Sequence, residues 1–141
     1  MFFSEDRNSL RRMYLQAWQR YRDGLPMEPL QAQIADVVAQ HPEYHPLLES
    51  GDLVLDQDWR PEQGIGNPFL HMGMHLAIRE QLATDRPAGI VAVHNTLLAM
   101  SGDVHEVEHR MAECLGETLW QSQRSGLPPD ENAYLEALRR L

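Results

Sequence analysis

Residues 103–109 read Asp-Val-His-Glu-Val-Glu-His, and this stretch places two histidines and two glutamates on the opening turns of an expected helix. Asp103 is a typical N-cap residue, and Glu106 stands at the capping-box position three residues later. The pattern predicts a helix that runs to about Arg124, before Gly126. Its inward stripe at helical spacing is Val104, Val107, Met111, Leu115 and Leu119.

Histidines recur at one spacing along the chain, because six of the seven stand in pairs four residues apart. On a helix this spacing lets two imidazoles of one face bind the same metal ion. The pairs are His41 with His45, His71 with His75, and His105 with His109. In the first pair each histidine precedes a proline, which disfavours helical dihedrals, so these two need not share a face.

The same periodicity and capping signals predict further helices. Their ranges are 4–23, 28–40, 67–84, 88–100 and 131–141, with Asn67-Pro68 as a strong helix start. Residues 47–66 are irregular, and residues 52–55 are their only strand-like run. The expected fold is all-α, an up-and-down bundle of about five to six helices with this long irregular segment between helices two and three. Residues 1–141 are expected to form a single helical domain.

An up-and-down order would bring the starts of the third and fifth helices to one end of the bundle. The leading hypothesis is therefore a transition-metal site, zinc or iron first, formed by four histidines with a carboxylate as ligand or outer partner. The histidines are His71, His75, His105 and His109, and the carboxylates are Glu108 and Glu113. Glu108 points among Val104, Leu115 and Leu119, where an unpaired carboxylate would be costly. The reaction expected of such a site is metal-dependent hydrolysis, group transfer or oxygen-linked redox chemistry.

Two other functions fit the same residues. In a metal-free interaction or adaptor domain, the histidines would be buried and hydrogen-bonded for structural reasons. Alternatively, residues 105–109 satisfy the H-E-x-x-H pattern of zincin metalloproteases, although zincins use this helix beside a sheet edge that the sequence scarcely offers. A ferritin-like dinuclear site usually has a second Glu-x-x-His, which is missing here.

The amino-acid composition argues against several classes of function. The formal charge is −9, and all 12 basic residues are arginine, which disfavours nucleic acid as a partner and excludes lysine Schiff-base chemistry. No apolar run approaches the length of a membrane span or signal peptide, so we expect no membrane partner and a cytoplasmic location. Cys114 is the only cysteine, which excludes an internal disulfide. A small-molecule substrate or a protein partner is compatible with this composition.

Three segments carry a resemblance to a known family: residues 41–45, residues 67–81 and residues 105–117. With them, nearly the whole chain resembles a family of small, helical, proteobacterial proteins known as a domain of unknown function, number 1841. The resemblance implies a stand-alone bacterial protein. It implies no activity, cofactor or catalytic residue.

Overall fold

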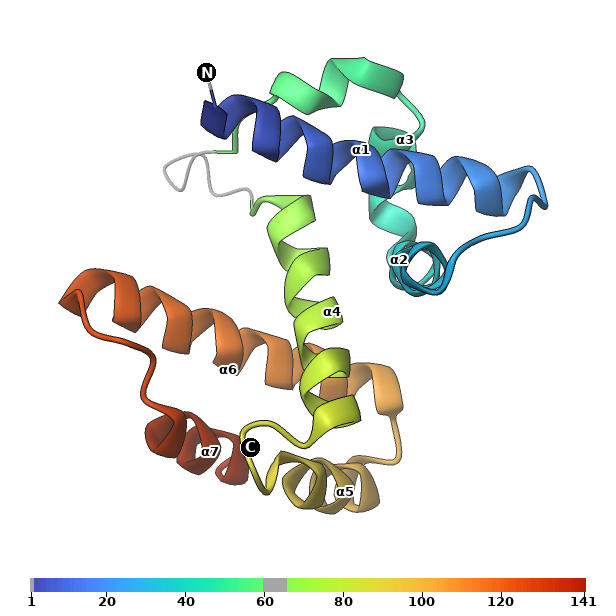
Figure 1. The fold of residues 1–141 in the computed structure, drawn as a ribbon. Helices are drawn as coiled ribbons and strands as arrows, with labels where there is room; N and C mark the ends of the chain where they lie inside the picture. The colour runs from blue at the N-terminus through green and yellow to red at the C-terminus, as the bar shows by residue number, and fades with distance from the viewer. Residues whose placement is uncertain (1, 60–65) are drawn as a thin grey trace. The chain divides into compact units, whose positions relative to one another are not determined.

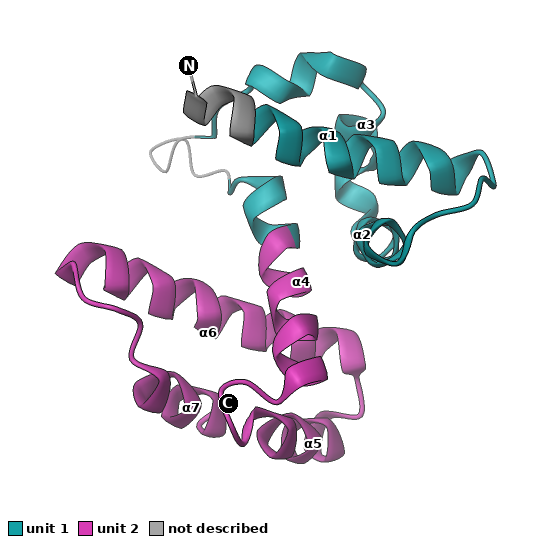
Figure 2. Cartoon of the chain, in the orientation of Figure 1, with its two compact units in different colours: residues 1–72 teal, residues 73–141 magenta. Residues whose placement is uncertain are grey.

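The computed structural model describes residues 2–59 and 66–141, and the side chains of residues 2–6 are not described. Helices are the regular structure of these two ranges, which contain no strand, so the expected all-α fold is confirmed. The chain divides into two compact units, residues 1–72 (unit 1) and residues 73–141 (unit 2) (Figure 2). The single domain expected for the whole chain stays a prediction, because such a division describes contacts and not independent folding.

Unit 1 begins with two long helices that pack on each other (Figure 1). They bury side chains at spacings of three and four, which is the periodicity that predicted them: Tyr14, Ala17 and Trp18 on the first and Ile34, Val37 and Val38 on the second. The elements of unit 1 are α1 (Phe2–Arg22), α2 (Pro29–Ala39), η1 (Pro42–Tyr44), α3 (His45–Leu48) and η2 (Gly51–Asp56).

The strand-like interpretation of residues 52–55 is wrong, because they form the 3-10 helix η2. A strand needs a partner for its backbone groups. Here the carbonyl oxygens of Val54 and Leu55 instead accept hydrogen bonds from Nη1 of the buried Arg11, at 3.3 and 2.8 Å. Residues 60–65 of the predicted irregular segment lie outside the described residues.

Helix α4 (Pro68–Thr84) has the bounds that the sequence predicts. Oδ1 of Asn67 accepts hydrogen bonds from the backbone amides of Phe69 and Leu70, at 2.9 and 3.2 Å, and Pro68 occupies the first helical position. The helix begins in unit 1 and continues into unit 2 (Figure 2). His71 and His75 are therefore one turn apart on one helix.

Unit 2 contains the rest of α4 and three further helices: α5 (Ile90–Ser101), α6 (Val104–Ser125) and α7 (Glu131–Arg139) (Figure 1). Their buried apolar faces form one cluster. Of the predicted stripe on α6, Val107, Met111 and Leu115 are buried and Leu119 packs against the cluster. Val104 is 58% exposed, so its inward placement is wrong: it is the first residue of α6, where the helix has only just begun.

A sharp turn between α5 and α6 sets where the second of these helices begins. Gly102 has φ 75°, a left-handed conformation that glycine adopts without strain, and its amide donates to the carbonyl of Leu98. Oδ1 of Asp103 then accepts from the amide of Glu106 at 3.1 Å, as an N-cap does. Both histidines of α6 consequently lie in its first two turns. Within the described ranges, no helix has the length and apolarity that crossing a membrane requires.

Candidate metal centre

His75 is the buried centre of a polar cluster in unit 2. Its side chain is 0% exposed, and its Nδ1 lies 2.8 Å from Oε1 of Glu108 on α6. Arg79, one turn further along α4, donates from Nε to Oε1 and Oε2 of the same carboxylate at 3.3 and 3.0 Å. Glu108 is only 6% exposed, so these two donors supply the partners that a carboxylate on the apolar side of α6 needs.

The surroundings of Glu108 keep it ionised. Burial raises the pKa of Glu108, but hydrogen bonds from His75 and Arg79, together with the positive charge of Arg79, outweigh burial and leave the pKa below its usual value. A carboxylate accepts hydrogen bonds and does not donate them, so Nδ1 of His75 carries the proton of this contact. Nε2 of a neutral His75 is then the nitrogen with the lone pair, as in histidines that bind metals through Nε2.

His109 of α6 faces this nitrogen. Its Nδ1 lies 3.4 Å from Nε2 of His75, and its Nε2 lies 2.9 Å from Oε1 of Glu113. In each imidazole one nitrogen faces a carboxylate, and we call it the outer nitrogen. The other nitrogen of each ring, the inner one, faces the inner nitrogen of the other ring. If both outer nitrogens donate, the two inner nitrogens meet lone pair to lone pair, an arrangement that a proton or a metal cation between them would stabilise.

The distance between the inner nitrogens also matches a metal site. Zinc binds imidazole nitrogen at about 2.0–2.1 Å, so two nitrogens on one tetrahedral ion lie about 3.3–3.4 Å apart. His109 and His75 meet at 3.4 Å without any change of rotamer. An N–H···O hydrogen bond, at about 2.7–3.2 Å, is shorter than this separation.

His105 completes the group of imidazoles in unit 2. Its ring stacks on that of His75 with centroids 5.7 Å apart and planes inclined by 9°, and it lies 6.5 Å from the ring of His109. The His105 side chain is exposed on the first turn of α6. Unit 2 thus brings together five of the six predicted residues: His75, His105 and His109 with Glu108 and Glu113. Their role as metal ligands or outer partners stays a prediction.

The sixth predicted residue, His71, lies in unit 1 beside His41. Their rings meet edge to face with centroids 5.1 Å apart. The ring of Tyr44 stacks on His41 at 5.6 Å and lies 6.1 Å from His71. A ring nitrogen of His41 and one of His71 lie within 4.8 Å of each other, a separation that two ligands of one metal ion can have.

His45 makes a different set of contacts. Its Nε2 lies 2.8 Å from the carbonyl oxygen of Val38, and its ring packs on Trp18 with centroids 4.4 Å apart. His41 bonds the preceding carbonyl, that of Val37, through Nδ1 at 2.7 Å. The two histidines of this pair therefore both help to end α2, but only His41 joins another histidine.

Sequence reasoning missed Arg79 and Tyr44. Arg79 stands four residues after His75, so the periodicity that pairs His71 with His75 would have placed it on the same face of α4. Tyr44 carried no comparable signal. Its position against both rings depends on the turn after α2 and on the packing of α4 within unit 1.

The zincin pattern of residues 105–109 gains no support from these contacts. Glu106, its expected general base, is exposed, and its amide belongs to the cap of α6. Glu108, the other glutamate of the pattern, is engaged by His75 and Arg79. No strand is found in residues 2–59 or 66–141, so these ranges contain no sheet edge to align a peptide.

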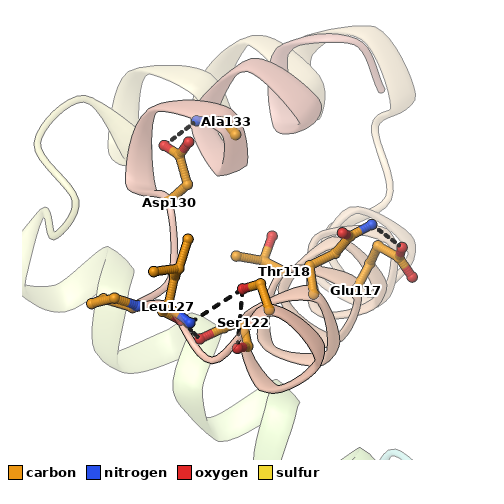
Figure 3. A pocket seen from close by; sticks show the side chains of 9 residues that line it. Glu117, Thr118, Ser122, Leu127, Asp130 and Ala133 are labelled. Carbon is orange, nitrogen blue, oxygen red and sulfur yellow. Dashed lines mark hydrogen bonds between the residues drawn. The ribbon is translucent and has the colours of Figure 1, made fainter.

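A separate hollow of about 380 Å³ lies between the end of α6 and the start of α7 (Figure 3). Its hydroxyl groups are engaged within the chain: Thr118 donates to the carbonyl of Cys114, and Ser122 to that of Leu127. Asp130 caps α7 by accepting from the amide of Ala133. These groups stabilise the turn between the two helices and need no ligand.

Comparison with known proteins yields one match. No curated protein and no solved structure matches the chain. The family described as a domain of unknown function, DUF1841, matches residues 6–140. This match covers both units and every histidine discussed above, and the chain belongs to this family.

Proposed function

We propose that the protein binds a transition-metal ion in unit 2 through His75, His105 and His109. The observation that carries this proposal is the pair of facing nitrogens, Nε2 of His75 and Nδ1 of His109, 3.4 Å apart. Both rings are oriented from outside by a carboxylate, which is the usual arrangement around histidines that bind a metal. His105 stacks on His75 with ring centroids 5.7 Å apart, and a rotation of its exposed side chain would bring the third imidazole to the ion.

The donor set favours zinc or iron. Imidazole nitrogen suits zinc, copper, iron and nickel, whereas magnesium and calcium take oxygen ligands. Glu108 is held by His75 and Arg79, and it acts in this proposal as the outer partner that orients His75. Glu113 has the same role toward His109 and, being exposed, is also able to rotate toward the ion.

The centre would have room for a reacting molecule. Three protein ligands leave one position of a tetrahedral ion for water or substrate, as in catalytic zinc sites. His105 is exposed and the His109 side chain is 39% exposed, so this position would face solvent and not the buried core. An ion held there would lower the pKa of a bound water and support hydrolysis or group transfer, and iron would extend this to oxygen-linked redox chemistry.

The competing explanation for the facing nitrogens is a proton. A His109 that is protonated on both nitrogens would donate to Glu113 and toward His75, and the cluster would then be a structural element of a metal-free domain. Metal content separates the two explanations.

The test is elemental analysis of protein purified without an affinity tag or chelator, beside the double variant His105→Ala/His109→Ala. Both substituted side chains reach solvent, so the variant is expected to fold, and circular dichroism checks this. His94→Ala is the matched control, since His94 is half-buried on α5 and belongs to neither group of histidines. We expect at least about one equivalent of zinc or iron in the wild type and in the control. The double variant should contain about one equivalent less. Equal metal in all three proteins, or none that can be loaded, would overturn the proposal.

A further inference from the structure

Unit 1 carries two histidines that the proposed centre does not use. His41 and His71 come from the end of α2 and the start of α4, and their rings lie 5.1 Å apart. His45, four residues after His41, does not join them. It packs on Trp18 and bonds the carbonyl of Val38.

We infer that His41 and His71 form a second metal position in unit 1, distinct from that of His75, His105 and His109. This inference rests on the proposed metal-binding function, because it assigns a second ion to the same chain. The ion would again be one that prefers imidazole nitrogen. With two protein ligands, most of its coordination positions would be left to water or substrate.

The orientation of His41 supports this assignment. Its side chain is buried, with 3% of the residue exposed, and Nδ1 lies 2.7 Å from the carbonyl oxygen of Val37. A carbonyl only accepts hydrogen bonds, so Nδ1 carries the proton and Nε2 carries the lone pair. Donation from Nδ1 to a backbone carbonyl is one of the outer contacts that typically orient a metal-binding histidine. Nothing in this contact depends on unit 2.

The position of His71 supports it as well. His71 lies in the first turn of α4, where its amide donates to the carbonyl of Asn67 at 3.0 Å. The ring of Tyr44 lies against both histidines and restricts the directions from which solvent reaches them. A ring nitrogen of each lies within 4.8 Å of one in the other, so both rings can reach one ion.

A second ion would widen the chemistry that the chain can perform. His71 and His75 are one helical turn apart, so α4 would supply a ligand to each ion. An ion with open coordination positions polarises a carbonyl or phosphoryl oxygen and lowers the pKa of a bound water. The substrate class that suits the unit 1 ion is a hydrolysable ester, amide or phosphate ester.

Titration of the metal-depleted protein with Co²⁺, followed by calorimetry and by the visible absorption of the bound ion, tests the inference. Variants His71→Ala and His109→Ala each remove a ligand of one position, and His94→Ala again serves as the control. We expect about two equivalents bound by the wild type and the control and about one by each variant. His41→Ala is a second variant for the unit 1 position. His41 is buried, so its loss could prevent folding, whereas His71 is only half-buried and the variant His71→Ala keeps the test valid in that case.

The outcomes separate the inference from the proposed function. Two equivalents bound by His71→Ala would overturn the second position and leave the proposed centre in unit 2 intact. A single equivalent in the wild type that both variants lose would also overturn it, because His71 and His109 would then serve the same ion. Two equivalents retained by His109→Ala would instead overturn the proposed centre in unit 2.

Discussion

The carboxylate of Glu108 and the imidazole of His75 form a buried pair, with Oε1 2.8 Å from Nδ1, that joins α6 to α4 within unit 2. The two residues are separated by 33 positions in the chain. Arg79 holds the other side of the carboxylate. This pair supports the core of unit 2 and, in our proposal, also directs Nε2 of His75 toward the metal.

Glu108→Gln should weaken both the fold and metal binding. The amide oxygen still accepts from Nδ1 of His75, but the negative charge that Arg79 pairs with is lost, and we expect a cost of about 1–3 kcal/mol. Loss of the outer carboxylate should reduce metal affinity by about 10- to 100-fold. Urea unfolding and competition with a chelating indicator measure the two effects.

Glu108→Ala is the harsher comparison. It leaves Arg79 without its carboxylate and opens a void beside His75, so the cost should rise to about 3–5 kcal/mol. If both variants bound metal as the wild type does, Glu108 would have no orienting role and the buried pair would be purely structural.

Asp103→Ala should weaken both α6 and the metal centre. The N-cap contributes about 0.5–2 kcal/mol, and its loss frays the turn that carries His105 and leads to His109. Asp130→Ala is a matched control, because Asp130 caps α7 through an equivalent hydrogen bond to the amide of Ala133. Thermal unfolding should show similar losses of stability for the two variants. Only Asp103→Ala should lower metal affinity, and an equal effect of Asp130→Ala would contradict the link between this cap and the centre.

Arg11→Met should destabilise unit 1. Nη1 of Arg11 donates to the carbonyls of Val54, Leu55 and Gln57, at 3.3, 2.8 and 2.8 Å, and the arginine is 4% exposed. A buried carbonyl that loses its donor costs about 1–3 kcal/mol, so the substitution should cost at least this amount.

Trp59 fluorescence reports on this change, since the guanidinium of Arg11 lies 5.1 Å from the centre of its ring. Arg12→Met is the control: Arg12 is the next residue, is exposed, and should change stability by less than about 0.5 kcal/mol. Equal unfolding midpoints for the two variants would show that Arg11 does not hold η2.

Tyr14 should make unit 1 sensitive to alkali. Burial raises the pKa of Tyr14 to about 12, and only 3% of the residue is exposed. In the unfolded chain a tyrosine ionises near pH 10, so as the pH rises above about 10 the unfolded state loses the proton first. The contribution of Tyr14 to stability is therefore fully present below about pH 10 and falls between about pH 10 and 12.

Tyr14→Phe should remove the part of the stability loss at alkaline pH that Tyr14 causes. Tyr21→Phe should leave the loss of stability unchanged, because Tyr21 is 50% exposed. Urea unfolding at a series of alkaline pH values, together with the absorbance of tyrosinate, measures this loss of stability. An alkaline loss that Tyr14→Phe leaves intact would assign the sensitivity to another group.

Local signals in the sequence determined the helices and much of the candidate site. A cap and its first turn involve neighbours along the chain, so Asn67-Pro68 and Asp103 predicted the starts of α4 and α6 correctly. The same is true of the shared face of His71 and His75, which needs nothing beyond a helix. Val104 and residues 52–55 were misjudged because their environment depends on which element packs against them.

Tertiary packing decided which histidines meet. The sequence indicated that His41 and His45 need not share a face, because Pro42 and Pro46 follow them, but it gave no other partner for either histidine. His41 meets His71 at a separation of 30 positions in the chain, and His75 meets Glu108 at a separation of 33. Such contacts depend on the directions in which packed helices present their side chains. Composition, charge and helical periodicity are properties of the sequence itself, whereas the tautomer of His75 and the 3.4 Å between its Nε2 and His109 exist only in the folded chain.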